Sequence, residues 1–196
     1  MSKFLIVGLG NIGAEYDHTR HNIGFDVADA LVARLGGVFM SDRLAHVAKV
    51  SFKGRRLVVI KPTTFMNLSG RAFRYWLDKE NLAPENSLTI VDDLALPLER
   101  IRIRPSGSSA GHNGLRDIET VLGHDTYPKL RFGIGSNFPK GGQVDFVLGR
   151  WSGEELPLVR QKINISVNAV LDFCIAGIEK TMNTYNKMTI ILTKGE

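Results

Sequence analysis

Five polar side chains follow predicted strands, or the loops after them, where α/β proteins usually bind ligands. Asn11 follows the first apolar run, and His21 closes the loop after it. Asn67 opens a helix, Asp92 ends a strand, and Asn113 follows a glycine-rich loop. Ligands of α/β sheets bind in the crevice beyond the carboxyl ends of the strands. We therefore expect these side chains to converge on one site.

An imidazole, a carboxylate and three carboxamides together predict a hydrolytic site. Histidine takes a proton from water near neutral pH, and a carboxylate on its other ring nitrogen fixes the tautomer and stabilises the imidazolium. Carboxamides donate and accept hydrogen bonds, so they hold a peptide backbone without reading its side chains. The set needs no metal and no covalent nucleophile. Taken singly, Asn11 and Asn67 also fit a turn or a helix cap, and Asp92 beside Asp93 also fits a solvated strand end.

A dinucleotide-binding motif competes with this interpretation. Gly8, Gly10 and Gly13 spell G-x-G-x-x-G directly after a strand. That motif places its third glycine inside a helix, whereas residues 15–22 carry no apolar stripe, and Asp29 falls within a predicted helix instead of at a strand end. The sequence therefore disfavours a nicotinamide-dependent enzyme.

A nucleophile-elbow motif, G-x-S-x-G, spans residues 107–111. A serine hydrolase would need an acid and then a histidine later in the chain. Asp117 lies between His112 and His124, but it shares a short predicted helix with its neighbours, so no triad can assemble from it. We expect both histidines to be loop or helix-surface residues, and the motif to be a Gly/Ser loop or lid.

The order of predicted elements indicates an α/β domain with a mostly buried sheet, because strands and helices alternate along the chain. A capping box formed by Ser152 and Glu155 precedes a long final helix, in which apolar residues from Leu156 to Ile178 recur every three or four positions and include Cys174 as a packing residue. The expected strands are 3–9, 47–52, 57–60, 87–91, 98–104 and 130–135, and the expected earlier helices are about 25–35, 69–80 and 114–122.

Length and composition indicate one ordinary globular domain. The chain has 196 residues, of which 43% are hydrophobic, and a formal net charge of +5. Its single cysteine, Cys174, excludes an intrachain disulfide and favours a reducing compartment, with the cytoplasm as the default. No apolar stretch approaches the roughly 20 residues of a membrane span.

The positive charge is concentrated in residues 100–150, which hold eight basic and four acidic side chains. Arg100, Arg102 and Arg104 alternate with isoleucines, so on a strand they share one face at intervals of about 6.5 to 7 Å. Guanidinium groups suit phosphate oxygens. This region therefore predicts a docking face for a polyanion, nucleic acid above all, although a solvated basic surface has the same composition.

Five short segments of the sequence form a recognisable set: GLGN at 8–11, TRHN at 19–22, TFMNLSG at 64–70, GHNGL at 111–115 and LRFGIG at 130–135. Together they resemble the bacterial peptidyl-tRNA hydrolase family, and the resemblance runs from the first strand to about Asn186. It implies one α/β domain over residues 1–187, with a central mixed, twisted sheet surrounded by helices, and a tail at 188–196. It also implies a monomeric, metal-independent and cofactor-free esterase that releases tRNA from peptides stranded by aborted translation.

The resemblance also implies roles for individual residues. His21 would activate water, and Asp92 would orient the His21 ring. Asn11 would act with them at the reacting carbonyl. Two further groups are implied: Tyr16, Met66, Asn67 and Asn113 for the peptide and the terminal adenosine, and Arg102, Arg104 and Arg131 for the tRNA 5′ phosphate.

Three positions depart from the family pattern. Ile12 replaces a usual proline, Ala95 replaces a common acid, and residues 106–109 contain fewer glycines than is typical. The catalytic groups are retained, so hydrolysis of peptidyl-tRNA is the expected function. A noncatalytic RNA-binding protein that uses the same basic face is the alternative.

Overall fold

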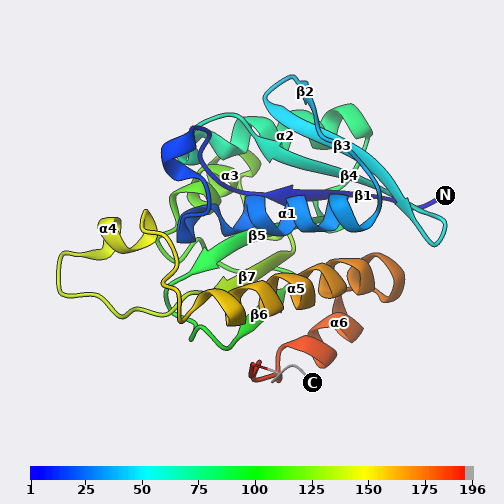
Figure 1. Cartoon of the computed structure of the whole chain (residues 1–196). Helices are drawn as coiled ribbons and strands as arrows, with labels where there is room; N and C mark the ends of the chain where they lie inside the picture. The colour runs from blue at the N-terminus through cyan, green and yellow to red at the C-terminus, as the bar shows by residue number, and fades with distance from the viewer. Residues whose placement is uncertain (193–196) are drawn as a thin grey trace.

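The computed structural model describes residues 1–192 and shows a single sheet with helices on both faces (Figure 1). The strands lie in the order β2-β3-β4-β1-β5-β7-β6. Pairings among β1, β4, β5 and β7 are parallel, whereas β2, β3 and β6 join in antiparallel register, so the sheet is mixed and the expected fold class is confirmed. The strands are β1 (Lys3–Gly8), β2 (Met40–Asp42), β3 (Ala45–Phe52), β4 (Arg55–Pro62), β5 (Ser87–Asp93), β6 (Ile101–Arg104) and β7 (Lys129–Gly133).

Each face of the sheet has its own hydrophobic core. Val27 and Leu31 of the first helix pack with Val167 and Val170 of the fifth helix on one face. Phe73, Trp76, Leu115 and Ile118 of the second and third helices pack on the other. The helices are α1 (Ile23–Arg34), α2 (Ser69–Glu80), α3 (Asn113–Leu122), α4 (Gln143–Val147), α5 (Leu156–Ala176) and α6 (Ile178–Tyr185).

Two glycines bring the start of α1 against the end of β1. A Cβ atom on Gly8 would lie 2.2 Å from the carbonyl oxygen of Gly24, which no real side chain tolerates. Gly13 precedes only a short 3-10 turn, η1 (Ala14–Tyr16), and α1 begins later at Ile23. The glycine motif therefore serves close packing, and its third glycine does not enter a helix as dinucleotide binding requires.

Most predicted elements are confirmed, including α2 at its expected bounds and the capping box, in which Ser152 and Glu155 exchange reciprocal backbone-to-side-chain hydrogen bonds. Cys174 is buried, and burial raises the pKa of its thiol to about 12, in keeping with a packing role.

Several predicted elements differ in extent from those observed, and two of these differences have a clear backbone cause. The strand expected at 98–104 begins only at Ile101, because a turn closed by the Arg100 N–H on the Pro97 carbonyl comes before it. The long final helix stops at Ala176, because Gly177 has a φ of +87°, which right-handed helices do not use; α6 then follows as a separate helix. The short elements β2 and α4, which bury no residue, were not predicted.

The first part of the expected tail packs against the body. Ile190 is buried, and its N–H donates to the Glu99 carbonyl over 2.8 Å. The side chain of Gln161 donates to the Ile191 carbonyl. Residues 193–196 of the tail lie outside the described residues. Among residues 1–192, no helix combines the length and apolar character needed to cross a membrane.

Candidate active site

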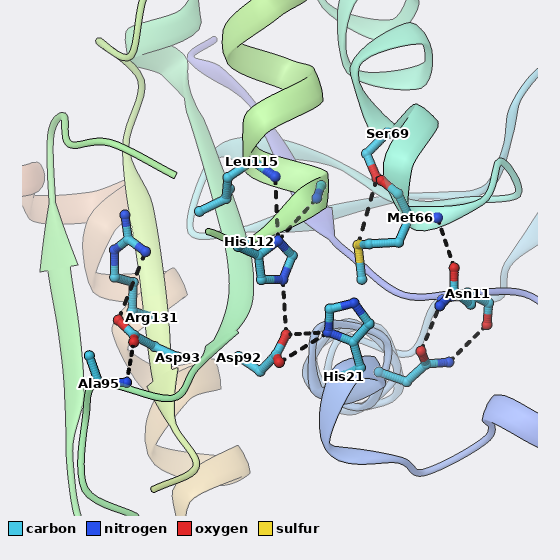
Figure 2. Close-up of polar contacts among 12 residues, drawn as sticks. Asn11, His21, Met66, Ser69, Asp92, Asp93, Ala95, His112, Leu115 and Arg131 are labelled. Atoms are coloured by element: carbon cyan, nitrogen blue, oxygen red, sulfur yellow. Dashed lines mark hydrogen bonds and ion pairs between the residues drawn. The ribbon is translucent and has the colours of Figure 1, made fainter. Parts of the chain in front are cut away.

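His21 and Asp92 form the centre of the site at the carboxyl end of the sheet (Figure 2). Asp92 lies near the end of β5, and His21 lies in a 3-10 turn, η2 (Arg20–Asn22), directly before α1. The Nδ1 atom of His21 lies 3.0 Å from both carboxylate oxygens of Asp92. The close packing of α1 on β1 is what brings this turn to β5.

The tautomer of His21 follows from its partner. An ionised carboxylate only accepts hydrogen bonds, so Nδ1 carries the proton and Nε2 presents a lone pair. Within residues 1–192 that Nε2 atom has no hydrogen-bond partner, and the side chain is 14% exposed. Burial alone would lower the pKa of His21, but the charge and hydrogen bond of Asp92 outweigh it and raise the pKa above 6.5. His21 is therefore an oriented base with a free nitrogen.

His112 is a member of the site that the sequence analysis missed, since we expected a loop or helix-surface residue. Its side chain is only 8% exposed, and its Nε2 lies 3.0 Å from Asp92 Oδ1. Its Nδ1 accepts from the backbone N–H groups of Gly114 and Leu115 and caps α3. Backbone N–H groups only donate, so Nδ1 is the accepting nitrogen and the proton lies on Nε2. The Nε2–H group therefore donates a hydrogen bond to Asp92. The position directly before a predicted helix was the available signal for such a cap.

Asp92 thus accepts hydrogen bonds from two imidazoles while it is buried. Desolvation by burial would raise the pKa of its carboxyl, but His112 and His21 outweigh that effect and hold the pKa well below its usual range. The carboxylate is ionised throughout the pH range in which His21 titrates.

Asn11 has a fixed amide orientation beside the central pair. Its Oδ1 accepts the backbone N–H of Met66 over 2.8 Å, and its backbone is held from both sides by the side chain of Asn22. Its Nδ2 donor is therefore turned away from Met66, and it has no partner within the described chain. The structure brings Asn11 and Met66 together with His21 as expected, on the side of the site opposite Arg131 (Figure 2).

The other expected substrate-binding residues surround this centre less closely. Asn67, in a 3-10 turn (Met66–Leu68), and Asn113, at the start of α3, are exposed, and their amides make no hydrogen bond within residues 1–192. Tyr16 lies in η1 and is half-buried, and no contact joins its side chain to His21 or Asp92. Met66 is buried, with its sulfur 3.8 Å from the Ser69 hydroxyl.

A cavity of about 210 Å³ opens beside the histidines. The loop that carries the serine motif forms part of its wall. Among the described residues, no histidine or carboxylate side chain is hydrogen bonded to the Ser109 hydroxyl, so that serine lacks an activating base. The lining comprises His21, Asp92, Asp93, Leu94, Ala95, Arg131, residues 109–113, and Gln143, Val144 and Val147 of α4.

The predicted row of three arginines is wrong for Arg100. This residue precedes β6, and its guanidinium donates to the Asn186 carbonyl. Arg102 and Arg104 do share the exposed side of β6, the edge strand. Arg131 lies opposite Arg102 in the β6–β7 register, but its side chain is only 11% exposed. Its guanidinium donates to the Ser108 carbonyl and lies 3.8 Å from the Asp93 carboxylate.

One group of described residues has the side chains and spacing of a metal site. The ligand atoms of His21, Asp92 and His112 lie within 4.8 Å of one another. Those same atoms are joined by the hydrogen bonds described above, so a metal ion would have to displace both protons from the carboxylate. The donor set thus suits an oriented general base better than a resident metal ion.

Comparison with known proteins identifies the family of this chain. The model of the peptidyl-tRNA hydrolase family matches residues 5–192. A peptidyl-tRNA hydrolase of Phocaeicola vulgatus is 53% identical over 185 residues, which span 94% of this chain and 99% of that protein. One from Cytophaga hutchinsonii is 51% identical over 184 residues, or 94% of this chain and 98% of the relative.

A solved structure extends the match to the fold. The crystal structure of peptidyl-tRNA hydrolase from Acinetobacter baumannii superposes with a TM-score of 0.89 at 31% identity and covers 95% of each chain. The resemblance found in the five short segments is confirmed, and the chain belongs to the peptidyl-tRNA hydrolase family.

Proposed function

We propose that the protein hydrolyses the ester bond between a peptide and the terminal ribose of peptidyl-tRNA, which returns the tRNA for use after aborted translation. The observation that carries the proposal is the His21–Asp92 pair beside a cavity, in which the Nε2 atom of His21 has no hydrogen-bond partner among residues 1–192. Membership of the family supplies the substrate, and this chain retains the side chains that the reaction needs.

The reaction uses His21 twice. Its Nε2 takes a proton from water while the water oxygen attacks the ester carbonyl, and the imidazolium is stabilised by Asp92 through Nδ1–H. When the tetrahedral intermediate collapses, the bond to the ribose oxygen breaks, and the imidazolium returns the proton to that oxygen. The products are a peptide carboxylic acid, which loses its proton to solvent, and a tRNA with a free hydroxyl, and His21 is again neutral.

The carboxamides stabilise charge and hold the peptide. The Nδ2 donor of Asn11 is oriented and without a partner in the described chain, so it suits the oxyanion that develops at the carbonyl. The exposed amides of Asn67 and Asn113 are available to the peptide backbone and the terminal nucleotide, while buried Met66 and half-buried Tyr16 shape the crevice.

Arginines of β6 and β7 bind the tRNA end of the substrate in this proposal. Arg102 and Arg104 are exposed on the edge strand, and Arg131 sits in the cavity wall with Asp93 as a counter-ion. Planar guanidinium groups suit phosphate oxygens. The two exposed arginines therefore contact the phosphate most directly, and Arg131 also holds the loop that contains Ser108.

We further propose that the protein acts as a monomer in the cytoplasm and uses neither a metal nor an organic cofactor. The single buried cysteine fits a reducing compartment. The general-base arrangement supplies its own activated water, so the proposed reaction requires no further group.

The decisive experiment separates this enzyme from a noncatalytic RNA-binding protein. Purified protein is incubated with N-blocked aminoacyl-tRNA in the presence of a chelator, and released amino acid is counted together with filter-bound tRNA. Hydrolysis that survives chelation supports the proposal. Retention of intact substrate without hydrolysis selects the binding protein instead.

A further inference from the structure

Arg20, which directly precedes His21, is a buried charge that the reaction scheme above does not use. Its side chain is 10% exposed. Nη1 donates to the Phe146 carbonyl over 3.1 Å, and Nη2 pairs with Glu155 over 3.0 Å. The guanidinium also lies over the rings of Phe146 and Trp151, with 4.2 and 5.2 Å to the ring centres. One side chain thus joins η2 to the end of α4 and to the start of α5.

Backbone contacts extend this junction along both segments. The Arg20 N–H donates to the Gly149 carbonyl, and Thr19 forms an isolated antiparallel bridge with Arg150. The guanidinium of Arg150 in turn binds the carbonyls of Asp17 and Ala14. Several hydrogen bonds therefore join residues 146–150 to the loop that leads to His21.

Gly149 makes room for the Arg20 guanidinium. A Cβ atom at this position would lie 3.0 Å from Arg20 Nη1 and 3.1 Å from the Asp145 carbonyl oxygen. These spacings are tighter than most real Cβ contacts, so any side chain would displace the guanidinium or the last turn of α4. The glycine and the arginine form one packing unit.

Helix α4, which Arg20 contacts through Phe146, forms one wall of the cavity. Gln143, Val144 and Val147 of α4 line it, yet no residue of α4 is buried. Only Phe146 and Val147 of this helix are partly buried against the core, so α4 depends largely on the contacts at its ends for its position. At the carboxyl end of α4 the contacts are the stacked and hydrogen-bonded guanidinium of Arg20 and the pairing of Phe146 with Phe138.

We propose that Arg20 is a positioning residue for the reaction: its side chain sets the place of the His21 imidazole against Asp92 and, at the same time, the place of the α4 wall over the cavity. The inference rests on the proposed function. A displacement of about 1 Å at a reacting group can lower a rate about 100-fold. Arg20 therefore acts on turnover through His21, and on substrate binding through α4.

The test compares Arg20→Met, which keeps the apolar stem, with Arg20→Lys, which keeps the charge but loses the planar guanidinium and its two Nη donors. Arg34→Met is the matched control, because Arg34 joins the far end of α1 to Asn168 of α5 without touching η2. We expect Arg20→Met to lower kcat about 10- to 100-fold and to raise KM several-fold. Arg20→Lys should lie between it and the wild type, and Arg34→Met should leave both constants unchanged.

A readout independent of turnover is the pKa of the His21 ring, followed by NMR. Loss of Arg20 should lower that pKa, because a displaced imidazole loses part of its contact with Asp92. This titration also separates the two proposals. If the wild type failed to hydrolyse peptidyl-tRNA while the ring pKa still fell in Arg20→Met, the proposed function would fail and the positioning role would stand.

Two milder variants test the inference if Arg20→Met does not fold. Gly149→Ala moves the guanidinium by a few tenths of an ångström, and Glu155→Gln removes its counter-ion. Both should lower kcat several-fold and lower the His21 pKa. Unchanged kcat, KM and ring pKa in these variants, accompanied only by a lower Tm, would show that Arg20 merely stabilises the fold and would overturn the inference.

Discussion

The Nε2–H of His112 and the Nδ1–H of His21 donate to the same oxygen, Oδ1 of Asp92, each over 3.0 Å. The two rings lie 5.0 Å apart, centre to centre, and only His21 leaves a nitrogen free. His112 cannot accept a proton at Nδ1 without losing the cap it gives α3. Its position therefore assigns it to the support of Asp92, whereas His21 is the ring that exchanges protons with substrate.

Replacement of His112 by alanine should destabilise the fold. The change removes a hydrogen bond to a buried carboxylate and the cap of α3, losses that typically amount to about 1 to 3 kcal/mol together. Urea denaturation gives the free energy of unfolding directly. His124→Ala is the control, because that exposed histidine contacts only the backbone N–H of Thr126. Equal stability of the two variants would contradict the account.

Asp92→Asn should shift the pH profile as well as the rate. In the wild type, kcat/KM falls as pH drops through the raised pKa of His21, because the protonated ring cannot accept a proton from water. Without the carboxylate, burial of the ring prevails and the pKa falls, so the acid limb moves to lower pH. Turnover should fall by about 100-fold or more, since the imidazolium loses its stabilising charge. An acid limb that stays in place would disprove the coupling of the two residues.

Salt dependence distinguishes the arginines that contact phosphate from those that hold the protein together. Arg102→Ala and Arg104→Ala should each raise KM and reduce the slope of log KM against log salt by about one. Arg100→Ala should leave the slope unchanged, because the Arg100 guanidinium donates a hydrogen bond to the Asn186 carbonyl and not to phosphate in this account. Identical slopes in all three variants would remove the exposed face of β6 from the tRNA interface.

Lys162 predicts a separate dependence of stability on pH. Its ammonium is buried under Phe132 and donates to the Gly133 carbonyl, and burial lowers its pKa to about 7. Between that value and the usual 10.5 of an unfolded lysine, the unfolded chain binds the extra proton, so stability rises with pH. Lys162→Met should remove about 1 to 3 kcal/mol of this rise between pH about 7 and about 9. Parallel stability curves for the two proteins would contradict the shift.

The sequence was sufficient to predict the centre of the site, because strand ends can be located from apolar runs. Asn11, His21 and Asp92 each follow such a run or its loop, and the topology brings them together. His112 was missed because its role depends on the direction of a side chain at a helix cap, which periodicity does not reveal. Arg20 was likewise hidden, since its partners lie more than 120 residues away in the chain.

Backbone conformation explains the errors in the elements. Gly177 carries a left-handed φ that ends α5, although the apolar spacing continues through it to Ile178. The alternation of arginine and isoleucine starts one residue before the strand does, so Arg100 falls in the preceding turn. In both cases the pattern of side chains along the sequence was read correctly. The residue at which the backbone leaves or enters the regular element was not.

The most direct test of the central claim is single-turnover hydrolysis of N-blocked aminoacyl-tRNA by His21→Ala, with tRNA binding measured on the same preparation. The account predicts a rate about 10² to 10⁴ lower than that of the wild type, with tRNA affinity nearly unchanged, because the ring acts on water and not on the tRNA contacts. A rate close to that of the wild type would show that His21 is not the general base.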